Sequence, residues 1–398
     1  MERMTIELPR TARALPHTDP VSFIDPAGRP VEPGLHAGYT LPDAQTLIRF
    51  YRRMVRARRF ESQVTALTRQ GRLATYPSAF GQEACEVGAA SALAEDDWMF
   101  PTYRDSAAIL TRGAEPGDIL GSFRGDWHCG YDPQELRTSP QATPLATQTL
   151  HAVGYAMAAK LRGTDQATLT FIGDGATSEG DAHEAFNFAA VWQTPTVFFI
   201  QNNQYAISVP LCEQSNATML ADKAVGYGMP GVRVDGNDIA AVFAVVSAAL
   251  ERARRGEGPA LVEGLTYRLE AHTNSDDSTR YRSSDEVDIW RTRDPLARLE
   301  AYLRAAGELD DEAVAAIAAD AEELAAHVRE LMNTEAQIDP TELFAPVYAH
   351  ERPQLREQQA LLEAELAAAG NAPQSHPPVL SHSPVQSQPA PRPQRAGA

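Results

Sequence analysis

The feature that most limits the fold of this chain is an alternation of short apolar runs with helical segments through its centre. Four runs have the length and composition of buried strands: residues 167–172, 196–200, 232–234 and 260–265. Between them, residues 179–191 and 240–255 carry apolar side chains at helical spacing. This pattern predicts an α/β fold, with a doubly wound, mostly parallel sheet and helices on both faces.

The two ends of the chain differ from its centre in composition. Residues 1–40 are rich in Pro, Thr and Asp without a sustained period, so we expect an N-terminal arm. Residues 41–370 form the predicted main domain, with helical patterns over 43–69 and 311–332. Residues 371–398 contain seven prolines with Ser, Gln and His, which predicts a disordered tail.

Composition limits the classes of partner. The formal net charge of the 398 residues is −18, so we expect neither nucleic acid nor a membrane surface as a partner. The longest nearly apolar stretch, residues 240–250, is too short to span a bilayer. Cys85, Cys129 and Cys212 are widely spaced and lack metal-site spacing, which favours a reducing compartment. We therefore expect a cytoplasmic globular protein.

The most informative segment is residues 171–208, FIGDGATSEGDAHEAFNFAAVWQTPTVFFIQNNQYAIS. A predicted strand ends in Gly173-Asp174-Gly175, a helix follows, and the next strand ends in Asn202-Asn203. The carboxyl ends of parallel strands share a crevice in which ligands bind. The glycines let the backbone approach a diphosphate closely, and the helix that follows directs its N-terminal amides at the anion.

Oxygen atoms of the same segment suit a hard metal ion. The carboxylate of Asp174, the side-chain oxygen of Asn203 and the carbonyl of Tyr205 are ligands that Mg²⁺ on a diphosphate prefers. A Gly-Asp-Gly by itself is usually a turn, and an Asn-Asn by itself is usually a loop. Because both occur at the ends of successive strands, together they predict a site for a diphosphate and a metal ion.

These motifs resemble those of thiamine-diphosphate enzymes. Over residues 45–365 the chain is similar to the alpha subunits of the decarboxylating components of branched-chain 2-oxo acid and pyruvate dehydrogenase complexes. The resemblance implies the thiamine-diphosphate-binding fold, with thiamine diphosphate and Mg²⁺ as cofactors. Tyr103 and Arg104 would reach the diphosphate, and Thr143 and Leu145 would line the aminopyrimidine. The positions that match the family's cofactor-binding residues are Tyr103, Arg104, Thr143, Leu145, Gly173, Asp174, Gly175, Ala176, Asn203, Tyr205 and His272.

A second cluster, residues 267–283 (YRLEAHTNSDDSTRYRS), is by itself a polar loop with charges of both signs. Its similarity to the family's active-site loop implies that His272 is catalytic and faces the cofactor. An imidazole can donate or accept a proton near neutral pH. The resemblance also implies a set of side chains that order the loop by mutual hydrogen bonds: Arg268, Asp276, Tyr281 and Arg282. In mitochondrial relatives the positions of Thr273 and Ser283 are phosphorylated, and whether they are phosphorylated here stays open.

The chain departs from the family pattern at three places. Gln201 stands where animal branched-chain enzymes have an arginine that holds the diphosphate. Glu270-Ala271 replaces a glycine-containing pair, and Ala142 replaces a serine near a potassium ion. A K⁺ ion stays a candidate ligand because three further positions around it match: Pro144, Thr147 and Gln148.

In this family, the glutamate that activates thiamine diphosphate belongs to the beta subunit. Glu83 of FGQEA is the one motif-like glutamate early in the chain, and we interpret it as structural. We therefore expect an alpha-two, beta-two assembly with the cofactor held between subunits. The acyl group would then pass to the lipoyl domain of an acyltransferase core.

The substrate is the least determined part of this hypothesis. The run SDDSTRYRSSDEVDIW is close to the branched-chain type, which favours branched-chain 2-oxo acids such as 3-methyl-2-oxobutanoate. QNNQYAIS and GEGPALVE also resemble bacterial pyruvate-type chains, so pyruvate is the alternative. An acetoin dehydrogenase would share every site residue. A non-catalytic scaffold subunit is the alternative from another class, and the intact Arg104, Asp174, Asn203 and His272 argue against it.

Overall fold

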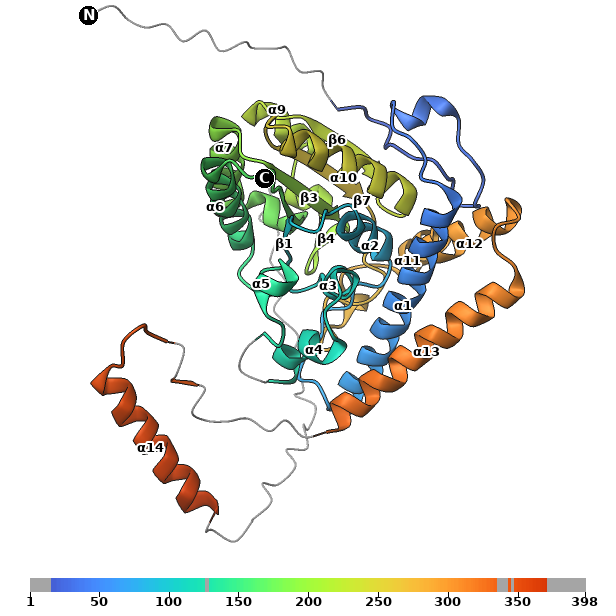
Figure 1. The fold of residues 1–398 in the computed structure, drawn as a ribbon. Coiled ribbons are helices and arrows are strands. Elements are labelled where there is room, and N and C mark those ends of the chain that lie inside the picture. Colours follow the sequence, from blue (N-terminus) through green and yellow to red (C-terminus); the bar gives the residue numbers. More distant parts are fainter. Residues whose placement is uncertain (1–15, 126–128, 335–342, 345–346, 371–398) are drawn as a thin grey trace, which may run out of the picture. The chain divides into compact units, whose positions relative to one another are not determined.

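The computed structural model describes residues 16–125, 129–334, 343–344 and 347–370 (Figure 1). By its internal contacts the chain divides into two compact units, Met1–Glu335 and Ala336–Ala398. The tail predicted at 371–398 lies outside the described residues. The predicted limits of the arm, the main domain and the tail stay predictions.

One five-stranded sheet forms the centre of the first unit. Neighbouring strands are all parallel, and their order in space differs from their order in the chain. The doubly wound parallel sheet expected from the sequence is therefore confirmed. In the register of the sheet, Gly173 lies opposite Gln201 of the next strand. In spatial order, the strands are β1 (Trp98–Phe100), β2 (Thr168–Gly173), β3 (Thr196–Asn202), β7 (Ala260–Leu265) and β6 (Gly231–Asp235).

Alternate side chains of the strands enter two separate cores, one on each face of the sheet. Phe171 and Phe199 belong to the larger core, whereas Phe198 and Ile200 belong to the smaller one. Helices α2 (Glu83–Ser91) and α10 (Ile239–Arg254) contribute to the larger core. Helices α6 (Thr147–Arg162) and α7 (Gly180–Trp192) cover the other face (Figure 1). Because both faces are covered, the strands carry mostly apolar side chains, as their sequences indicated.

Two long helices, α1 (Ala44–Arg69) and α13 (Asp311–Asn333), lie side by side and contribute apolar residues to the larger core (Figure 1). Asp43 caps α1 by accepting a hydrogen bond from the Thr46 amide, at 2.7 Å. Arg56 and Arg59 of α1 form ion pairs with Asp320 and Glu322 of α13. The four strands and four helices predicted from the sequence are all present, with ends shifted by no more than two residues.

The described part of the N-terminal segment packs against the body of the first unit. Val21 forms a parallel bridge with Val234 of β6. The buried carboxylate of Asp238 accepts hydrogen bonds from the amides of Phe23 and Ile24, at 2.7 and 2.9 Å. Arg298 donates to the Ile24 carbonyl. These contacts fix residues 21–24 beside the edge strand.

The shortest strands were not predicted, because runs of two or three residues carry no readable period. They include β1 and the antiparallel hairpin of β4 (Tyr205–Ala206) and β5 (Val209–Pro210). The remaining elements are α3 (Ser106–Arg112), α4 (Pro116–Arg124), α5 (Pro133–Leu136), α8 (Leu211–Gln214), α9 (Lys223–Tyr227), α11 (Ser284–Arg291), α12 (Pro295–Ala305), α14 (Pro353–Gly370) and the 3₁₀ turns η1 (Pro33–His36), η2 (Gly175–Ser178), η3 (Leu220–Asp222) and η4 (Ser278–Arg280).

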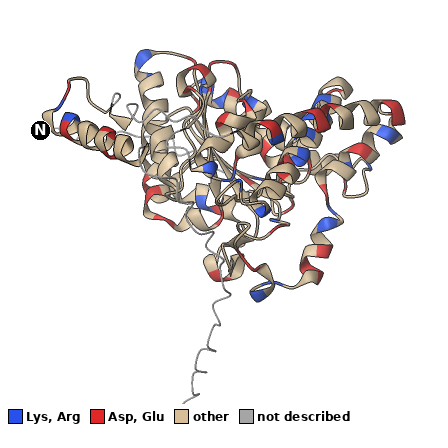
Figure 2. Cartoon of the chain, turned by 90° about the horizontal axis from the view of Figure 1, so that it is seen from below, with Lys and Arg blue, Asp and Glu red and all other residues tan. Residues whose placement is uncertain are grey.

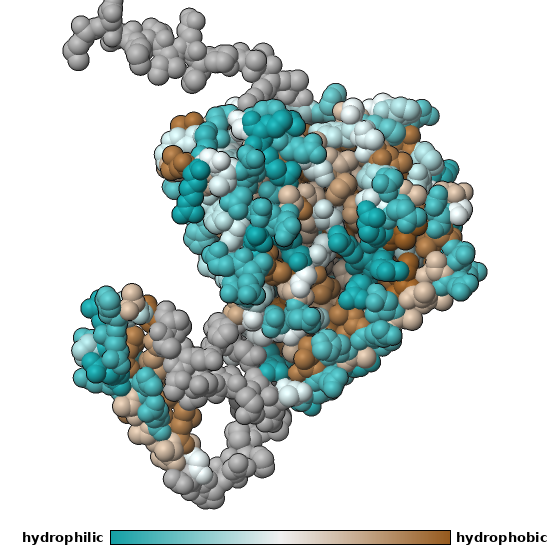
Figure 3. All heavy atoms as spheres, in the orientation of Figure 1, coloured by the Kyte–Doolittle hydropathy of each residue, from teal (hydrophilic) through white to brown (hydrophobic). Residues whose placement is uncertain are grey.

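Charged residues of both signs are spread over the helices in the view of Figure 2. Figure 3 shows hydrophobic residues among hydrophilic ones on the surface, including those of α14 in the second unit. Leu361 and Leu366 of that helix are exposed. Within the described part of the chain, no helix combines the length and apolar character needed to cross a membrane.

Candidate functional site

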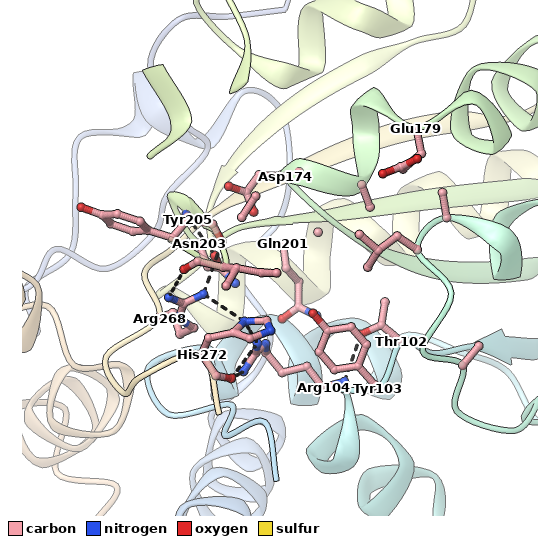
Figure 4. Close-up of a pocket in the computed structure, with 18 of the residues that line it drawn as sticks. Thr102, Tyr103, Arg104, Asp174, Glu179, Gln201, Asn203, Tyr205, Arg268 and His272 are labelled. Carbon is pink, nitrogen blue, oxygen red and sulfur yellow. Dashed lines mark hydrogen bonds between the residues drawn. The ribbon is translucent and has the colours of Figure 1, made fainter. Parts of the chain in front are cut away.

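A cavity lies at the carboxyl ends of β2 and β3 (Figure 4). The residues that line it come from six parts of the chain, at 82, 102–104, 142–148, 173–179, 201–207 and 268–272. Parallel strands end on the same edge of a sheet, so the loops that follow β2 and β3 meet there. The two informative segments of the sequence, 171–208 and 267–283, therefore contribute to one cavity.

Ten of the eleven predicted cofactor-binding residues line this cavity. The exception is Thr143, which is exposed beside the cavity while its neighbours Ala142 and Pro144 line it. What each of these residues does toward a cofactor stays a prediction. The residues of the prediction that line the cavity are Tyr103, Arg104, Leu145, Gly173, Asp174, Gly175, Ala176, Asn203, Tyr205 and His272.

The two glycines of the Gly-Asp-Gly turn at the end of β2 have different surroundings. A Cβ atom at Gly173 would meet open space, so this backbone is open to a ligand. A Cβ atom at Gly175 would lie 2.4 Å from the Cβ atom of Ala206, so Gly175 lets the β4–β5 hairpin approach the turn. The expected helix does not follow directly. The 3₁₀ turn η2 intervenes, and α7 begins only at Gly180.

Asp174 presents a buried carboxylate to the cavity. Its side chain is 3 % exposed, and it accepts a hydrogen bond from the Gln214 side chain at 3.0 Å. Burial raises the pKa of this carboxyl to about 6, although the hydrogen bond from Gln214 opposes the shift. Within the described residues Asp174 forms no ion pair of 4 Å or less. A buried carboxylate without a cation is costly, so this position favours a bound cation.

Asn203 and Tyr205 lie on the turn that joins β3 to the hairpin. The Asn203 Nδ2 group donates to Oε1 of Gln82 at 2.8 Å, and the Tyr205 amide donates to Oδ1 of Asn203 at 3.3 Å. The carbonyl of Tyr205 accepts from Arg268 at 3.4 Å. The orientation of the Asn203 amide is therefore set by two neighbours, one on each side.

Left-handed backbone conformations gather around the cavity. Ala146 and Ile207 line it with φ of 64° and 56°, and the neighbouring Gln204 has φ of 75°. Such angles are unusual for residues other than glycine, above all for the β-branched Ile207. Conformations of this kind persist only where the surrounding structure holds them, and they occur often at functional sites.

His272 is held between two guanidinium groups (Figure 4). Its Nδ1 atom lies 3.1 Å from Nη2 of Arg104 and 3.4 Å from Nη1 of Arg268. Because guanidinium groups only donate, Nδ1 must accept, and the hydrogen of the neutral ring is on Nε2. Burial, together with the charges of Arg104 and Arg268, lowers the pKa of His272 to about 4. The imidazole is therefore neutral at pH 7.

Arg104 also fixes the position of the loop that carries His272. Its Nη1 atom donates to the Ser78 carbonyl at 2.7 Å and to the His272 carbonyl at 3.2 Å. The side chain is 6 % exposed and lines the cavity. Arg104 thus both lines the cavity and holds the loop that carries His272.

The loop that carries His272 is ordered by hydrogen bonds among the side chains that the family resemblance predicted for this role. Asp276 accepts from the His272 amide at 2.9 Å and from the Tyr281 hydroxyl. Tyr281 in turn accepts from Arg268 at 3.0 Å. Arg282 donates to the carbonyls of residues 268–270, two of them at 2.9 and 2.8 Å. Outside this network, the Ser283 hydroxyl caps α11.

Two residues considered in the sequence have clear structural partners. The Gln201 side chain lines the cavity and donates from Nε2 to buried Asp105, whose pKa burial raises to about 6. Glu83 does not line the cavity. Its carboxylate accepts from the Gly81 amide at 3.0 Å and pairs with Arg58. This geometry supports the structural interpretation of Glu83.

Some lining residues were missed in the sequence, among them Gln82, Thr102, Glu179 and Ile207. Thr102 directly precedes Tyr103, and Gln82 directly precedes Glu83. This proximity to motif residues was the one sign in the sequence that Thr102 and Gln82 could line the cavity. Glu179 directly precedes α7, is exposed and lines the cavity. Nothing in the sequence indicates that Ile207 adopts a left-handed backbone.

The donor set decides which kind of metal ion could bind. In the regions that the structure describes, no group of three or more His, Cys, Asp or Glu side chains could hold a metal ion. A metal site here would combine the Asp174 carboxylate with the Asn203 side-chain oxygen, a backbone carbonyl and phosphate oxygens. Such an oxygen set, with one carboxylate and a substrate phosphate, suits Mg²⁺.

Comparison with known proteins agrees with the motifs. The family model of the dehydrogenase E1 component matches residues 51–340. The 3-methyl-2-oxobutanoate dehydrogenase subunit alpha of Mycobacterium tuberculosis is 47% identical over 350 residues, covering 88% of this chain and 95% of that protein. The 2-oxoisovalerate dehydrogenase subunit alpha of Bacillus subtilis is 40% identical over 290 residues, covering 70% of this chain and 87% of that protein. The pyruvate dehydrogenase E1 component subunit alpha of Acholeplasma laidlawii is 36% identical over 319 residues, covering 79% of this chain and 92% of that protein. The chain belongs to the dehydrogenase E1 component family.

Proposed function

We propose that this chain is the alpha subunit of a thiamine-diphosphate-dependent 2-oxo acid dehydrogenase that acts on branched-chain 2-oxo acids. The observation that carries the proposal is the presence of buried Asp174 and Asn203, just after neighbouring strands, in a cavity that also contains His272. The branched-chain substrate is supported by the relatives named for 3-methyl-2-oxobutanoate and 2-oxoisovalerate. Pyruvate is the alternative, supported by the relative named for pyruvate.

The residues of the cavity fit the cofactor that the family implies. Thiamine diphosphate, when bound, supplies a nucleophilic carbon for the keto group and accepts electrons as CO₂ leaves. Asp174, Asn203 and the Tyr205 carbonyl would bind Mg²⁺, and the open backbone at Gly173 leaves room for the diphosphate. The other proposed contacts to the cofactor come from Tyr103, Arg104, Thr143, Leu145, Gly175, Ala176 and His272, of which Thr143 lies outside the cavity of this chain.

His272 would act as a neutral hydrogen-bond donor. Its pKa of about 4 keeps the ring uncharged at pH 7, and Arg104 and Arg268 occupy Nδ1. The Nε2–H group can therefore donate to a substrate oxygen on which negative charge develops. A donor held in place before the reaction stabilises that charge without reorganisation.

A beta subunit would complete the site. Leu145 and Ile207 line the cavity but are 46% and 56% exposed in this chain, and Val209 close by is 40% exposed. Apolar side chains exposed around a site are typical of a surface that a partner covers. By family resemblance the partner supplies the activating glutamate, the assembly is alpha-two, beta-two, and the acyl acceptor is a lipoyl domain. K⁺ near Ala142 and a cytoplasmic location also stay proposals.

Two other functions are alternatives to this proposal, an acetoin dehydrogenase and a non-catalytic scaffold subunit. An acetoin dehydrogenase would use the same cavity and differ in substrate alone. A scaffold subunit without activity would have no need for a buried carboxylate at Asp174 or for a histidine held by two arginines. Both features cost free energy of folding and serve a ligand, so we favour the enzyme.

The proposal is tested by dye reduction with this chain purified together with its beta subunit, thiamine diphosphate and Mg²⁺. We expect activity with 2-oxoisovalerate to exceed that with pyruvate, and little activity without the beta subunit. A preference for pyruvate would contradict the branched-chain assignment but not the family. Activity with acetoin alone would favour an acetoin dehydrogenase. No activity with any of these, despite cofactor binding, would favour the scaffold.

A further inference from the structure

We propose that Gln82 is a positioning residue of the metal site. Its side chain holds the Asn203 amide so that the oxygen atom, not the nitrogen atom, is available to the metal ion. It also keeps one N–H group for the bound cofactor. This inference rests on the proposed function, because it assumes that Asn203 is a ligand of Mg²⁺.

The orientation of both amides follows from one backbone group. The Tyr205 amide can only donate, and it lies 3.3 Å from the Asn203 side chain, so Oδ1 of Asn203 must face it. Nδ2 of Asn203 then points to Gln82, 2.8 Å away, and the atom of Gln82 that receives it must be Oε1. The remaining polar atom of Gln82 is therefore Nε2, which carries two hydrogens.

That nitrogen atom has no hydrogen-bond partner among the residues that the structure describes. Nε2 of Gln82 is buried and makes no hydrogen bond to any described residue, although Gln82 is 0% exposed and lines the cavity. Buried donors almost always have a partner, and the exceptions call for an explanation. A ligand in the cavity would supply the missing acceptor. Thiamine diphosphate, with its phosphate oxygens and ring nitrogens, offers such acceptors.

Gln82 is itself firmly placed. It directly precedes α2, whose first residue, Glu83, accepts from the Gly81 amide and pairs with Arg58. One turn later, buried Glu86 accepts from the amides at the start of α3, at 3.1 and 3.3 Å. These contacts fix the end of α2 against the cavity. Gln82 can therefore orient Asn203 before a metal ion arrives.

A free amide side chain presents its oxygen and its nitrogen almost equally well. If Gln82 is replaced, the 3.3 Å contact with the Tyr205 amide alone opposes a turn of the Asn203 NH₂ group toward the metal ion. The NH₂ group carries partial positive charge and would repel the ion. Partners that orient metal ligands are typically worth about 10–100-fold in metal affinity. Replacement of Gln82 should therefore weaken Mg²⁺ binding and change the fold little.

The test is a Mg²⁺ titration of the alpha–beta assembly at fixed thiamine diphosphate, followed by intrinsic tryptophan fluorescence. Gln82→Met, which removes both polar atoms at similar volume, should raise the half-saturating Mg²⁺ concentration by about tenfold or more. Gln82→Glu keeps an acceptor for Asn203, so its Mg²⁺ midpoint should be no higher than about threefold above wild type. The same variant lacks the N–H group, so its affinity for thiamine diphosphate at saturating Mg²⁺ should fall by about fivefold or more.

Gln63→Met is the matched control. Gln63 is a buried amide of α1 that accepts a hydrogen bond from Arg329 at 2.8 Å and lies outside the cavity. Its replacement should lower the melting temperature but leave the Mg²⁺ midpoint unchanged. The positioning role would be overturned if Gln82→Met bound Mg²⁺ like wild type, or if Gln82→Glu were as weak as Gln82→Met. Unchanged cofactor affinity in Gln82→Glu would overturn the role of Nε2. If wild type itself showed no Mg²⁺-dependent cofactor binding, the proposed function would fail first.

Discussion

The two sides of the cavity are built in different ways. Asp174 and Asn203 directly follow strands of the central sheet and are 3% and 6% exposed. His272 lies on a loop without regular structure, and its position depends on side chains that reach across from elsewhere. Arg104 and Arg268 hold the ring, and Asp276 holds the backbone amide. We call Asp174 and Asn203 the strand side of the cavity, and His272 with Arg104, Arg268 and Asp276 the loop side.

The difference predicts different responses to damage. On the strand side, backbone hydrogen bonds of the sheet and two apolar cores fix the backbone, so the loss of a single side chain should leave the backbone of its neighbours in place. On the loop side, each side chain orients the next. Loss of one donor should therefore loosen the loop without disturbing the metal site. Variants that act on one side alone test this separation.

The largest effect is expected on the strand side. Asp174→Ala removes the one carboxylate of the proposed metal site, so Mg²⁺-dependent binding of thiamine diphosphate should weaken by more than about 100-fold. Because this carboxylate is buried with a raised pKa, its removal should not lower the melting temperature of the metal-free protein. Isothermal titration and thermal unfolding measure the two quantities.

Asp165→Ala serves as the control, since Asp165 is an exposed residue outside the cavity. It should bind the cofactor like wild type. Unchanged cofactor binding in Asp174→Ala would remove the metal assignment and leave the strand side without a function.

A smaller effect is expected on the loop side. Arg282→Met removes the donor to the carbonyls of residues 268–270. Of these three residues, only Arg268 lines the cavity. We expect kcat to fall by about tenfold, equivalent to about 1.4 kcal/mol, and amide hydrogen exchange of residues 269–276 to accelerate. The Mg²⁺ midpoint should stay the same.

The control for Arg282 is Arg291→Met, because Arg291 forms an exposed ion pair with Asp288 on α11. Exposed pairs contribute little, so this variant should behave like wild type. If Arg282→Met weakened Mg²⁺ binding as much as it lowered kcat, the two sides of the cavity would not be independent.

The same contrast explains what the sequence could predict. The strand side could be predicted from the sequence because Asp174 and Asn203 directly follow apolar runs, and parallel strands bring their carboxyl ends together. The loop side was identified by resemblance alone, since the spacing of His272, Asp276 and Tyr281 has no period. The 3₁₀ turn η2 was not predicted: it lies between β2 and α7, and Gly175 at its start packs against Ala206.

Residues brought to the cavity by tertiary packing were the hardest to foresee. Gln82, the residue directly before α2, contacts Asn203, which is more than 100 residues away in the chain. The left-handed backbone of Ile207 contradicts the preference of a β-branched residue, so local sequence argues against it. Both features depend on how α2 and the β4–β5 hairpin pack, which local patterns do not encode.

The smallest expected effect concerns the charge of His272. Its pKa is lowered from 6.5 to about 4, so the folded protein binds a proton at this residue less tightly than the unfolded chain. Stability from this residue is therefore lost as the pH falls from about 6.5 toward 4. His272→Gln removes the titrating group, so the fall in melting temperature between pH 7 and pH 5 should be smaller than in wild type, by about 1 or 2 °C. Acidic groups elsewhere titrate alike in both proteins and cancel in the difference. An equal fall in both would mean that His272 titrates as a free imidazole does, and that the two arginines do not hold it as a neutral donor.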